Sequence, residues 1–227
     1  MSKTMKEQNR FIFDMDGTLY RLDKGQSQTF AKSRFRADFL NNAYSFYMNR
    51  VGLSLKDSVA EHERISERYD GEVSLGLEAE YGIDRYDFFA NTWNLDPEEF
   101  VEIDKDLPEV LHQLKGRVAL LTAAPRIWAI SVLAHLGVES IFDGRIYTGE
   151  PDERKPNPRV FQRIADDFSV PTNRIFSIGD QEHTDIVPAR TIGMKTVLVG
   201  PSQDTVANYR ADNVKLAIGL LKREGFV

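Results

Sequence analysis

Short, continuous apolar runs alternate with longer segments of helical periodicity over most of the chain. Each run is rich in β-prone residues and stops at Asp, Thr or Gly, which is typical of a buried strand. The runs predict strands at Phe11–Phe13, Val118–Leu121, Ile175–Ile178 and Thr196–Val199, with a less regular fifth at Arg145–Thr148. Apolar residues at helical spacing predict helices at Pro108–Leu114, Ile127–Leu136, Pro158–Phe168 and Ile186–Ile192. Because strands that alternate with helices form βαβ units, we expect an α/β fold with a doubly wound parallel sheet.

Residues 21–100 break this alternation. They contain no run typical of a strand and instead predict several helices, including Thr29–Arg50 and Leu55–Arg68. We therefore expect residues 21–100 to form a helical cap domain, and residues 1–20 and 101–227 to form the α/β core. The insertion is rich in aromatic residues, which we interpret mainly as the packing core of a small helical bundle, with a minority able to face a substrate.

The composition is that of a soluble globular protein. Hydrophobic residues make up 41% and charged residues 28% of the 227 positions, so the chain is able to bury a core. The net charge of -6 disfavours nucleic acid polymers and acidic membrane surfaces as partners. The absence of cysteine excludes disulfides, a thiolate nucleophile and a Cys-based zinc site. Because no membrane span and no signal peptide is recognisable, we expect a cytoplasmic protein, monomeric or homodimeric.

Two carboxylates, Asp14 and Asp16, stand two residues apart where the first predicted strand ends. Their side chains point the same way and converge on one site. Two like charges this close are costly unless a cation or a proton lies between them, and Mg²⁺ prefers such oxygen ligands. Gly17 and Thr18 then turn the chain and can offer backbone N–H groups to an anion. The segment predicts a Mg²⁺ site beside an anion site, although alone it also fits a solvated turn.

Three further segments place polar groups at the same edge of the sheet, because the carboxyl ends of parallel strands meet there. Thr122 ends the second run, where its hydroxyl can donate to a phosphate oxygen. Lys155 precedes a Pro-Asn-Pro segment, which fixes the backbone ahead of a helix and aims the ammonium group inward, toward an anion. Asp180 is placed to complete the metal shell, and Asp185 to bind through water or to orient the ligands. We interpret His183 as a solvated neighbour, because carboxylate-rich magnesium sites rarely use imidazole.

These four segments resemble the four motifs of the haloacid dehalogenase superfamily of phosphohydrolases. The matching sequences are FIFDMDGTLY, LLT, the lysine of RKPNP, and IGDQEHTDI, and they extend over the core from Phe11 to Val199. The helical insertion is similar to the C1-type cap of that superfamily. The resemblance implies a Rossmann-like core with a cap, and a Mg²⁺-dependent phosphatase that acts on a small phosphorylated metabolite.

The resemblance also implies a role for each motif residue. Asp14 would attack phosphorus and form an aspartyl phosphate, with Mg²⁺ between Asp14 and the substrate. Asp16 would face the metal through its backbone carbonyl, while its side chain would protonate the leaving group and then take a proton from water. Thr122 and Lys155 would hold the phosphoryl oxygens. The implied metal ligands are Asp14, Asp16, Asp180 and Asp185, and the implied substrate-binding positions are Gly17, Thr18, Ala123 and Lys155.

A finer resemblance points to the branch that contains pyrimidine 5'-nucleotidases. It is carried by Leu19-Tyr20, by DPEEF at residues 96–100 and by LGVESIFDGRIYT at residues 136–148. Members of that branch often carry Asn after the motif-two threonine and an Asp pair in motif four, where this chain has Ala123 and Gly179-Asp180. These departures concern the substrate and not the reaction class. Tyr20, Arg126 and Trp128 lie near the predicted strand ends, where each can contact a substrate, although packing or a salt bridge accounts for them equally simply.

Several alternatives share parts of this pattern. A phosphatase of phosphosugars or phosphoglycolate, or a phosphosugar mutase, carries the same four motifs. A dehalogenase needs no acid at the position of Asp16, and a phosphonatase needs an activated lysine in the cap that the sequence does not indicate. A response-regulator receiver is about half this length. A phosphate- or metal-binding protein on the same fold usually lacks a catalytic acid, and here every acid is present.

Overall fold

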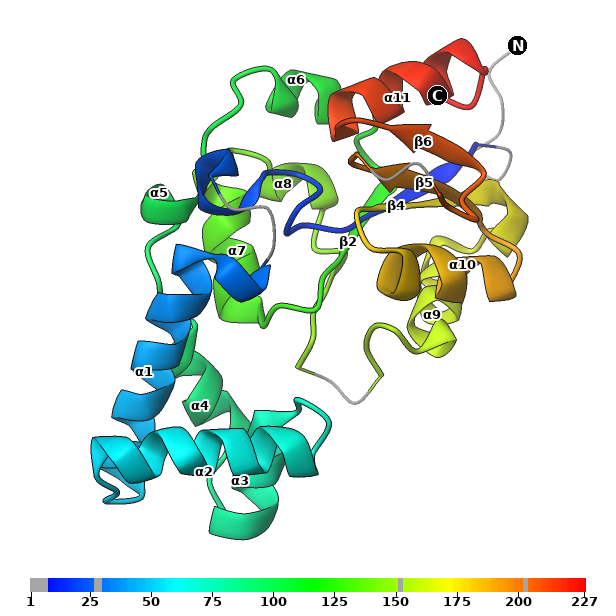
Figure 1. Ribbon diagram of the computed structural model, residues 1–227. Coiled ribbons are helices and arrows are strands. Elements are labelled where there is room, and N and C mark those ends of the chain that lie inside the picture. Colours follow the sequence, from blue (N-terminus) through cyan, green and yellow to red (C-terminus); the bar gives the residue numbers. More distant parts are fainter. Residues whose placement is uncertain (1–7, 27–29, 151–152, 202–203) are drawn as a thin grey trace. The chain divides into compact units, whose positions relative to one another are not determined.

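The computed structural model describes residues 8–26, 30–150, 153–201 and 204–227. The chain divides into two compact units, one formed by Met1–Arg21 with Val101–Val227 and the other by Leu22–Phe100. Figure 1 shows that the first unit contains the sheet and that the second is built of helices. We call them the core unit and the cap unit.

A six-stranded parallel sheet with the order β3-β2-β1-β4-β5-β6 forms the centre of the core unit. The strands are β1 (Arg10–Phe13), β2 (Val118–Leu121), β3 (Ile146–Tyr147), β4 (Ile175–Gly179), β5 (Lys195–Val199) and β6 (Tyr209–Ala211). The predicted α/β fold class is thereby confirmed, and each of the five predicted strands overlaps an observed one. The pattern did not predict β6, a three-residue edge strand that is only partly buried.

Helices cover both faces of this sheet, as Figure 1 shows. They are α6 (Leu107–His112), α7 (Arg126–His135), α8 (Glu139–Phe142), α9 (Pro158–Phe168), α10 (Val187–Thr191) and α11 (Val214–Arg223). On one face, Phe161 of α9 and Ala189 of α10 pack against Ile12 of β1. On the other, Phe11 stacks on Phe176 with ring centroids 5.7 Å apart. Because both faces are covered, the strands are apolar without alternation, which is why they were recognisable in the sequence.

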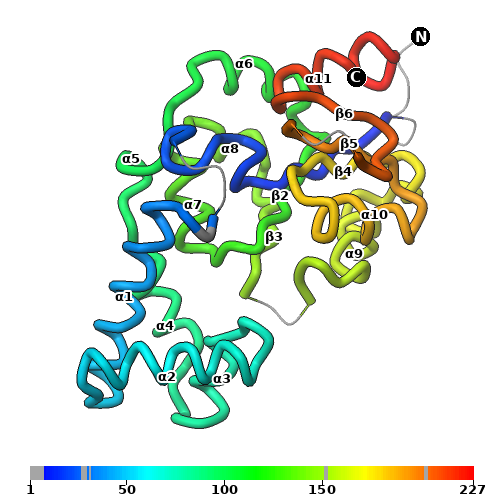
Figure 2. Tube along the Cα trace, in the orientation of Figure 1, coloured from blue at the N-terminus to red at the C-terminus, as the bar shows by residue number. Residues whose placement is uncertain are grey.

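The cap unit is a small helical bundle. Its main helices, consecutive along the chain in Figure 2, are α1 (Arg34–Arg50), α2 (Leu55–Arg68), α3 (Val73–Tyr81) and α4 (Arg85–Thr92), with a short α5 (Pro97–Phe100) and 3-10 turns at Leu22–Gly25 and Phe30–Lys32. A cluster of buried side chains fills the bundle, and its aromatic members are Phe46, Tyr47 and Phe88. Most of the aromatic residues therefore pack the bundle, as the sequence suggested. No helix in the described ranges is both long and apolar enough to cross a membrane.

Helix α1 begins later than the sequence predicted. The pattern placed its start at Thr29, which lies outside the described residues, whereas the α-helix begins at Arg34. The Ser33 hydroxyl accepts from the N–H of Arg36 at 3.0 Å, and the Asp23 carboxylate accepts from the N–H of Arg34 at 2.6 Å. These two side chains satisfy N–H groups that the first helical turn leaves without intrahelical partners, so they fix the start of the helix.

Candidate active site

The strand order brings the motif residues to one edge of the sheet. Strand β1 lies between β2 and β4, and its last residue, Phe13, pairs with Ile178 of β4. Asp14 follows directly, and its backbone N–H donates to the Ile178 carbonyl at 2.9 Å. Thr122 and Asp180 follow the two neighbouring strands. Residues more than 100 positions apart in the chain therefore meet at the carboxyl edge, where ligands of such sheets bind.

Three carboxylates and one ammonium group meet at this edge. Asp14, Asp180 and Asp185 each present an oxygen within 4.8 Å of the others. The Lys155 Nζ lies 2.6 Å from Asp14 Oδ1 and 2.7 Å from Asp185 Oδ1. Asp14, Asp185 and Lys155 are buried, whereas Asp180 is half-buried. Lys155 thus links two of the carboxylates by charge-assisted hydrogen bonds.

The negative charge of this cluster exceeds what Lys155 neutralises. Burial raises the pKa of Asp180, and the charges of Asp14 and Asp185 raise it further. Burial also raises the pKa of Asp185, an effect that Lys155 opposes. Burial alone would lower the pKa of Lys155, but Asp14 and Asp185 outweigh it, so the net shift is upward. Like charges held this close indicate a site for a cation.

An unpartnered oxygen supports the same conclusion. Among the described residues, Asp180 Oδ1 is buried and has no hydrogen-bond partner. An unpaired buried polar atom is costly, and a metal ion is one way to satisfy it. The donors are all carboxylate oxygens, the ligand type that Mg²⁺ prefers. Asp14, Asp180 and Asp185 therefore form an acidic triad suited to Mg²⁺.

Two glycines leave room for this triad. A Cβ on Gly179 would lie 2.3 Å from Asp185 Cγ, and a Cβ on Gly17 would lie 2.3 Å from Asp180 Oδ2. Gly17 also has a φ of +89°, a conformation that favours glycine. The motif glycines are thus required by the close approach of the carboxylates to the main chain.

A π-helical turn, Glu182–Ile186, fixes Asp185. The Asp185 N–H donates to the Gln181 carbonyl at 3.0 Å, and Asp185 Oδ2 accepts from the N–H of Gln181 at 3.0 Å. From β4, the Ser177 hydroxyl donates to the Asp185 carbonyl at 2.8 Å. Such turns are frequent at functional sites, and here the turn directs a carboxylate back toward Lys155.

The side chain of Asp16 points to a different set of partners. Its Oδ1 accepts hydrogen bonds from the Tyr20 hydroxyl and from Trp128 Nε1, the latter at 3.0 Å. Its Oδ2 accepts from the Thr122 hydroxyl at 3.2 Å. Burial raises the pKa of Asp16, the hydrogen bond from Tyr20 opposes the shift, and the charge of Asp14 adds to it. The Asp16 carboxylate does not belong to the acidic triad, so a contact of Asp16 with the metal would use its backbone carbonyl.

Two of the positions predicted to bind substrate, Thr122 and Thr18, make other contacts in this structure, and a third, Ala123, is exposed. The Thr122 hydroxyl, expected to donate to a phosphate, donates to Asp16 and accepts from the N–H of Ala124 at 3.0 Å. Thr18 donates its N–H to the Met15 carbonyl, closing the turn, and its hydroxyl to Asp14 Oδ2 at 2.9 Å. Thr18 and Thr122 therefore hydrogen-bond Asp14 and Asp16, the two catalytic candidates of motif one.

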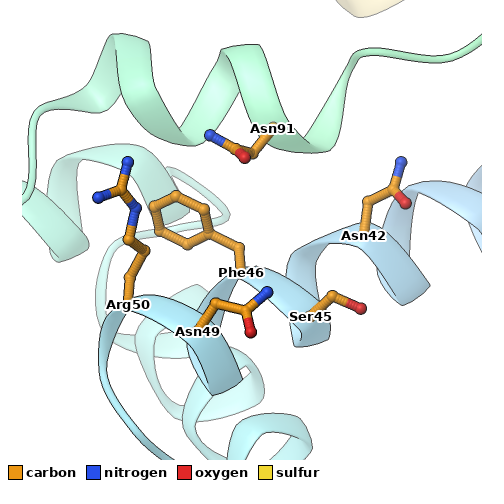
Figure 3. Close-up of a pocket in the computed structure, with 6 residues that line it drawn as sticks. All are labelled: Asn42, Ser45, Phe46, Asn49, Arg50 and Asn91. Carbon is orange, nitrogen blue, oxygen red and sulfur yellow. The ribbon is translucent and has the colours of Figure 1, made fainter.

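A pocket on the cap unit is separate from these residues. It lies between α1 and α4 and is lined by Asn42, Ser45, Phe46, Asn49, Arg50 and Asn91, as Figure 3 shows. Its charged residue, Arg50, is paired with Asp87 at 2.6 Å. None of the motif residues lines it, so we assign it no part in the chemistry.

Residues 9–193 match a family described as haloacid dehalogenase-like hydrolase. The chain belongs to this hydrolase family. Among curated relatives, the hydrolase is similar to glyceraldehyde 3-phosphate phosphatase of Pyrococcus abyssi, with 26% identity over 87 residues that make up 38% of this chain and 37% of that protein. It is also similar to pyrophosphatase PpaX of Halalkalibacterium halodurans, with 23% identity over 220 residues and 92% of each protein.

Solved structures show the same fold as this hydrolase. A HAD phosphatase from Thermococcus onnurineus aligns with a TM-score of 0.65 at 18% identity, covering 96% of this chain and 98% of that one. The HAD-hydrolase YfnB of Bacillus subtilis, bound to magnesium, aligns with a TM-score of 0.56 at 16% identity, covering 95% and 100%. The core with a helical cap is thus shared, while these matches do not identify a pyrimidine 5'-nucleotidase.

Sequence reasoning missed how two residues of the hydrolase are used. Tyr20 and Trp128 were considered as packing residues or as substrate contacts, and both are buried with their polar groups on Asp16. Arg126, considered with them, is exposed, as is His183. Tyr20 lies four residues after Asp16, a spacing at which contact across a turn was foreseeable. Trp128 is 112 residues away from Asp16, and nothing in the sequence indicated that contact.

Proposed function

We propose that this hydrolase is a Mg²⁺-dependent phosphatase that cleaves a small phosphomonoester through a phosphoryl-Asp14 intermediate. The observation that carries the proposal is the position of Asp14. Its carboxylate contacts the buried Lys155 ammonium at 2.6 Å and lies within the acidic triad. A nucleophile of this kind needs positive charge beside it, because it must approach a phosphoryl group of like charge; Lys155 supplies part of that charge, and a cation held by the triad would supply the rest.

The first half of the reaction forms a bond from Asp14 to phosphorus. An Asp14 oxygen attacks in line while the bond from phosphorus to the leaving oxygen breaks, and Asp16 gives its proton to that oxygen. Lys155 offsets the charge on the nucleophile and on the transferring group. In the second half, Asp16 takes a proton from a water molecule that attacks phosphorus. Phosphate leaves and the Asp14 carboxylate is restored.

Asp14, Asp180 and Asp185 would hold Mg²⁺, whose charge would let the anionic substrate approach the anionic nucleophile. Support comes from the unpartnered Asp180 oxygen and from the repulsion within the triad. The magnesium bound to the structurally similar Bacillus subtilis protein agrees with this assignment. Asp185, which hydrogen-bonds Lys155 and Gln181, would bind directly or orient the other ligands.

For the substrate, we propose a small non-nucleotide organic phosphate, such as a phosphosugar or phosphoglycolate. The named relatives are a phosphatase of glyceraldehyde 3-phosphate and a pyrophosphatase, and neither name refers to a nucleotide. Nucleoside 5'-monophosphates, suggested by the Leu19-Tyr20 and DPEEF segments, are the second candidate class.

The test is phosphate release from a panel of phosphosugars, 2-phosphoglycolate, pyrophosphate and nucleoside monophosphates, with Mg²⁺ and with chelator. We expect Mg²⁺-dependent turnover that Asp14→Asn abolishes, with kcat/KM highest for a phosphosugar or phosphoglycolate. Highest kcat/KM on UMP or CMP would favour the nucleotidase branch. Phosphoryl transfer from a sugar bisphosphate to a sugar monophosphate, without phosphate release, would favour a mutase. Turnover unaffected by Asp14→Asn would refute the proposed mechanism, and no turnover on any member would favour a binding protein.

A further inference from the structure

Three hydrogen-bond donors from separate parts of the core unit converge on the Asp16 carboxyl group. Tyr20 comes from the segment after β1, Thr122 from the end of β2 and Trp128 from α7. All three side chains are buried, and Trp128 and Thr122 have no exposed surface. Asp16 itself is half-buried, so it remains open on one side. We define these three residues as the Asp16 clamp.

The chemistry of the donors restricts how the carboxyl group can be oriented. An indole N–H can only donate, so the oxygen that faces Trp128 must accept. That oxygen, Oδ1, also accepts from the Tyr20 hydroxyl. Oδ2 faces the Thr122 hydroxyl, a group able to donate or accept. Oδ2 is therefore the oxygen free to carry a transferable proton.

Packing alone does not account for this arrangement. Phe at either aromatic position would fill similar space without a buried polar group that needs a partner. A half-exposed carboxylate, in turn, can be solvated by water and does not need three protein donors. The convergence of buried donors on one side of the group instead fixes its rotamer, which is what a side chain that transfers a proton to a defined atom requires.

We propose that Tyr20 and Trp128 are positioning residues that hold the Asp16 carboxyl group for proton transfer to the leaving oxygen. This inference rests on the proposed phosphatase function. The clamp belongs entirely to the core unit, so the cap is not needed to orient the acid. The hydrogen bonds of Tyr20 and Trp128 go to Asp16, so their loss should affect proton donation more than nucleophilic attack.

The dependence on the leaving group distinguishes positioning from folding. An alkyl phosphate releases a strongly basic alkoxide and needs a proton at the leaving oxygen, whereas p-nitrophenolate leaves without one. The ratio of kcat/KM for an alkyl ester to kcat/KM for p-nitrophenyl phosphate reports the steps through loss of the leaving group and excludes the hydrolysis step that both substrates share. This ratio does not depend on how much of the protein is correctly folded. A structural role would lower both rates together and leave this ratio unchanged.

The experiment measures this ratio with Mg²⁺ for the wild type, Tyr20→Phe, Trp128→Phe and Asp16→Asn. The alkyl ester is 2-phosphoglycolate, or the alkyl phosphate of the panel that turns over fastest. A matched control is Tyr147→Phe, which removes a core-unit hydroxyl bound to Asp167 and not to Asp16. We expect the ratio to fall at least about tenfold in both clamp variants, approaching that of Asp16→Asn, and to stay unchanged in Tyr147→Phe.

The outcomes separate the inference from the proposed function. If Asp16→Asn lowers the ratio but Tyr20→Phe and Trp128→Phe do not, the clamp inference is wrong and the phosphatase proposal stands. If the clamp variants lose both activities equally, their role is structural and the inference is again wrong. If the wild type hydrolyses neither ester with Mg²⁺, the proposed function fails and the inference fails with it.

Discussion

The main chain at Gly179 passes so close to Asp185 that only a hydrogen atom fits between them. A Cβ there would lie 2.3 Å from Asp185 Cγ and 2.4 Å from its Oδ2, far inside van der Waals contact. The same carboxylate accepts hydrogen bonds from Lys155 and from the Gln181 N–H. A single glycine therefore determines where one carboxylate of the triad can stand.

Gly179→Ala should weaken the affinity of the site for Mg²⁺. The added methyl group displaces Asp185 from Lys155 and disturbs the triad, so we expect the Mg²⁺ concentration at half-maximal activity to rise at least about tenfold, as for residues that orient metal ligands. The matched control is Gly219→Ala in α11, where the nearest atom would lie 3.7 Å away. Equal Mg²⁺ half-saturation in the two variants, measured by phosphate release, would contradict this description of the site.

At the scale of the element, helix α2 carries a histidine into the core of the cap. His62 is buried, its Nδ1 has no hydrogen-bond partner among the described residues, and its ring lies edge-on to Tyr44 and Tyr47. Burial, with a smaller contribution from the charge of Arg36, lowers the pKa of His62 to about 4. The folded cap therefore holds this imidazole neutral at pH values where the unfolded chain protonates it.

The lowered pKa of His62 makes the stability of the protein depend on pH. Between the unfolded pKa of about 6.5 and the folded pKa of about 4, the unfolded state binds the proton more tightly, so stability falls as the pH falls through this range. We expect wild type to lose about 2 kcal/mol more unfolding free energy than His62→Gln between pH 7 and pH 4.5. Urea unfolding followed by circular dichroism measures this, with the exposed His112→Gln as the control. Parallel pH profiles for wild type and His62→Gln would be the contrary result.

The sequence predicted elements well where burial alone sets the pattern. Helices α2 and α9 were predicted with their observed bounds because caps and apolar spacing agree. Edge strand β6 was missed because three partly exposed residues form no apolar run. Helix α11 was not predicted either, although the buried Val214, Ala217, Ile218 and Leu221 have helical spacing, so that pattern was present and overlooked.

The site was predictable to the extent that its residues end strands. Asp14, Thr122 and Asp180 follow buried runs, and parallel strand order brings such positions together. The direction of each side chain was not predictable in the same way. Thr122 turns its hydroxyl to Asp16 and Trp128 lies against the same carboxylate, contacts that depend on how α7 packs on the sheet and not on local pattern.

At the scale of the whole molecule, the acidic triad links the stability of the protein to metal binding. Burial, together with repulsion from Asp14 and Asp185, raises the pKa of Asp180. This destabilises the metal-free protein at neutral pH, and a bound cation would offset it. Saturating Mg²⁺ at about 100 times its Kd contributes about 2.7 kcal/mol, which for a chain of this size is about 5–10 °C in Tm. Metal binding should therefore be visible in global unfolding.

Asp180→Asn should raise the melting temperature of the metal-free protein and reduce the stabilisation by Mg²⁺. The amide replaces a carboxyl group whose ionisation is unfavourable in the folded, metal-free protein, so we expect the metal-free variant to melt a few degrees higher than the metal-free wild type. Most of the shift caused by Mg²⁺ should disappear. Thermal unfolding with Mg²⁺ and with chelator measures both effects. The exposed Asp212→Asn should keep the shift of the wild type. A full Mg²⁺ shift in Asp180→Asn would exclude Asp180 as a ligand.

The most direct test of the central claim is chemical trapping of the phosphoryl group on Asp14. Asp16→Asn is mixed with p-nitrophenyl phosphate and Mg²⁺, because this leaving group needs no proton while the second step lacks its base. The reaction is quenched in acid, the protein is digested, and the masses of the peptides are measured by mass spectrometry. We predict one added phosphoryl group on the peptide that contains Asp14, absent with chelator and in the Asp14→Asn, Asp16→Asn double variant. Release of p-nitrophenolate that depends on Mg²⁺ but leaves Asp14 unmodified, or that persists in the double variant, would contradict the account.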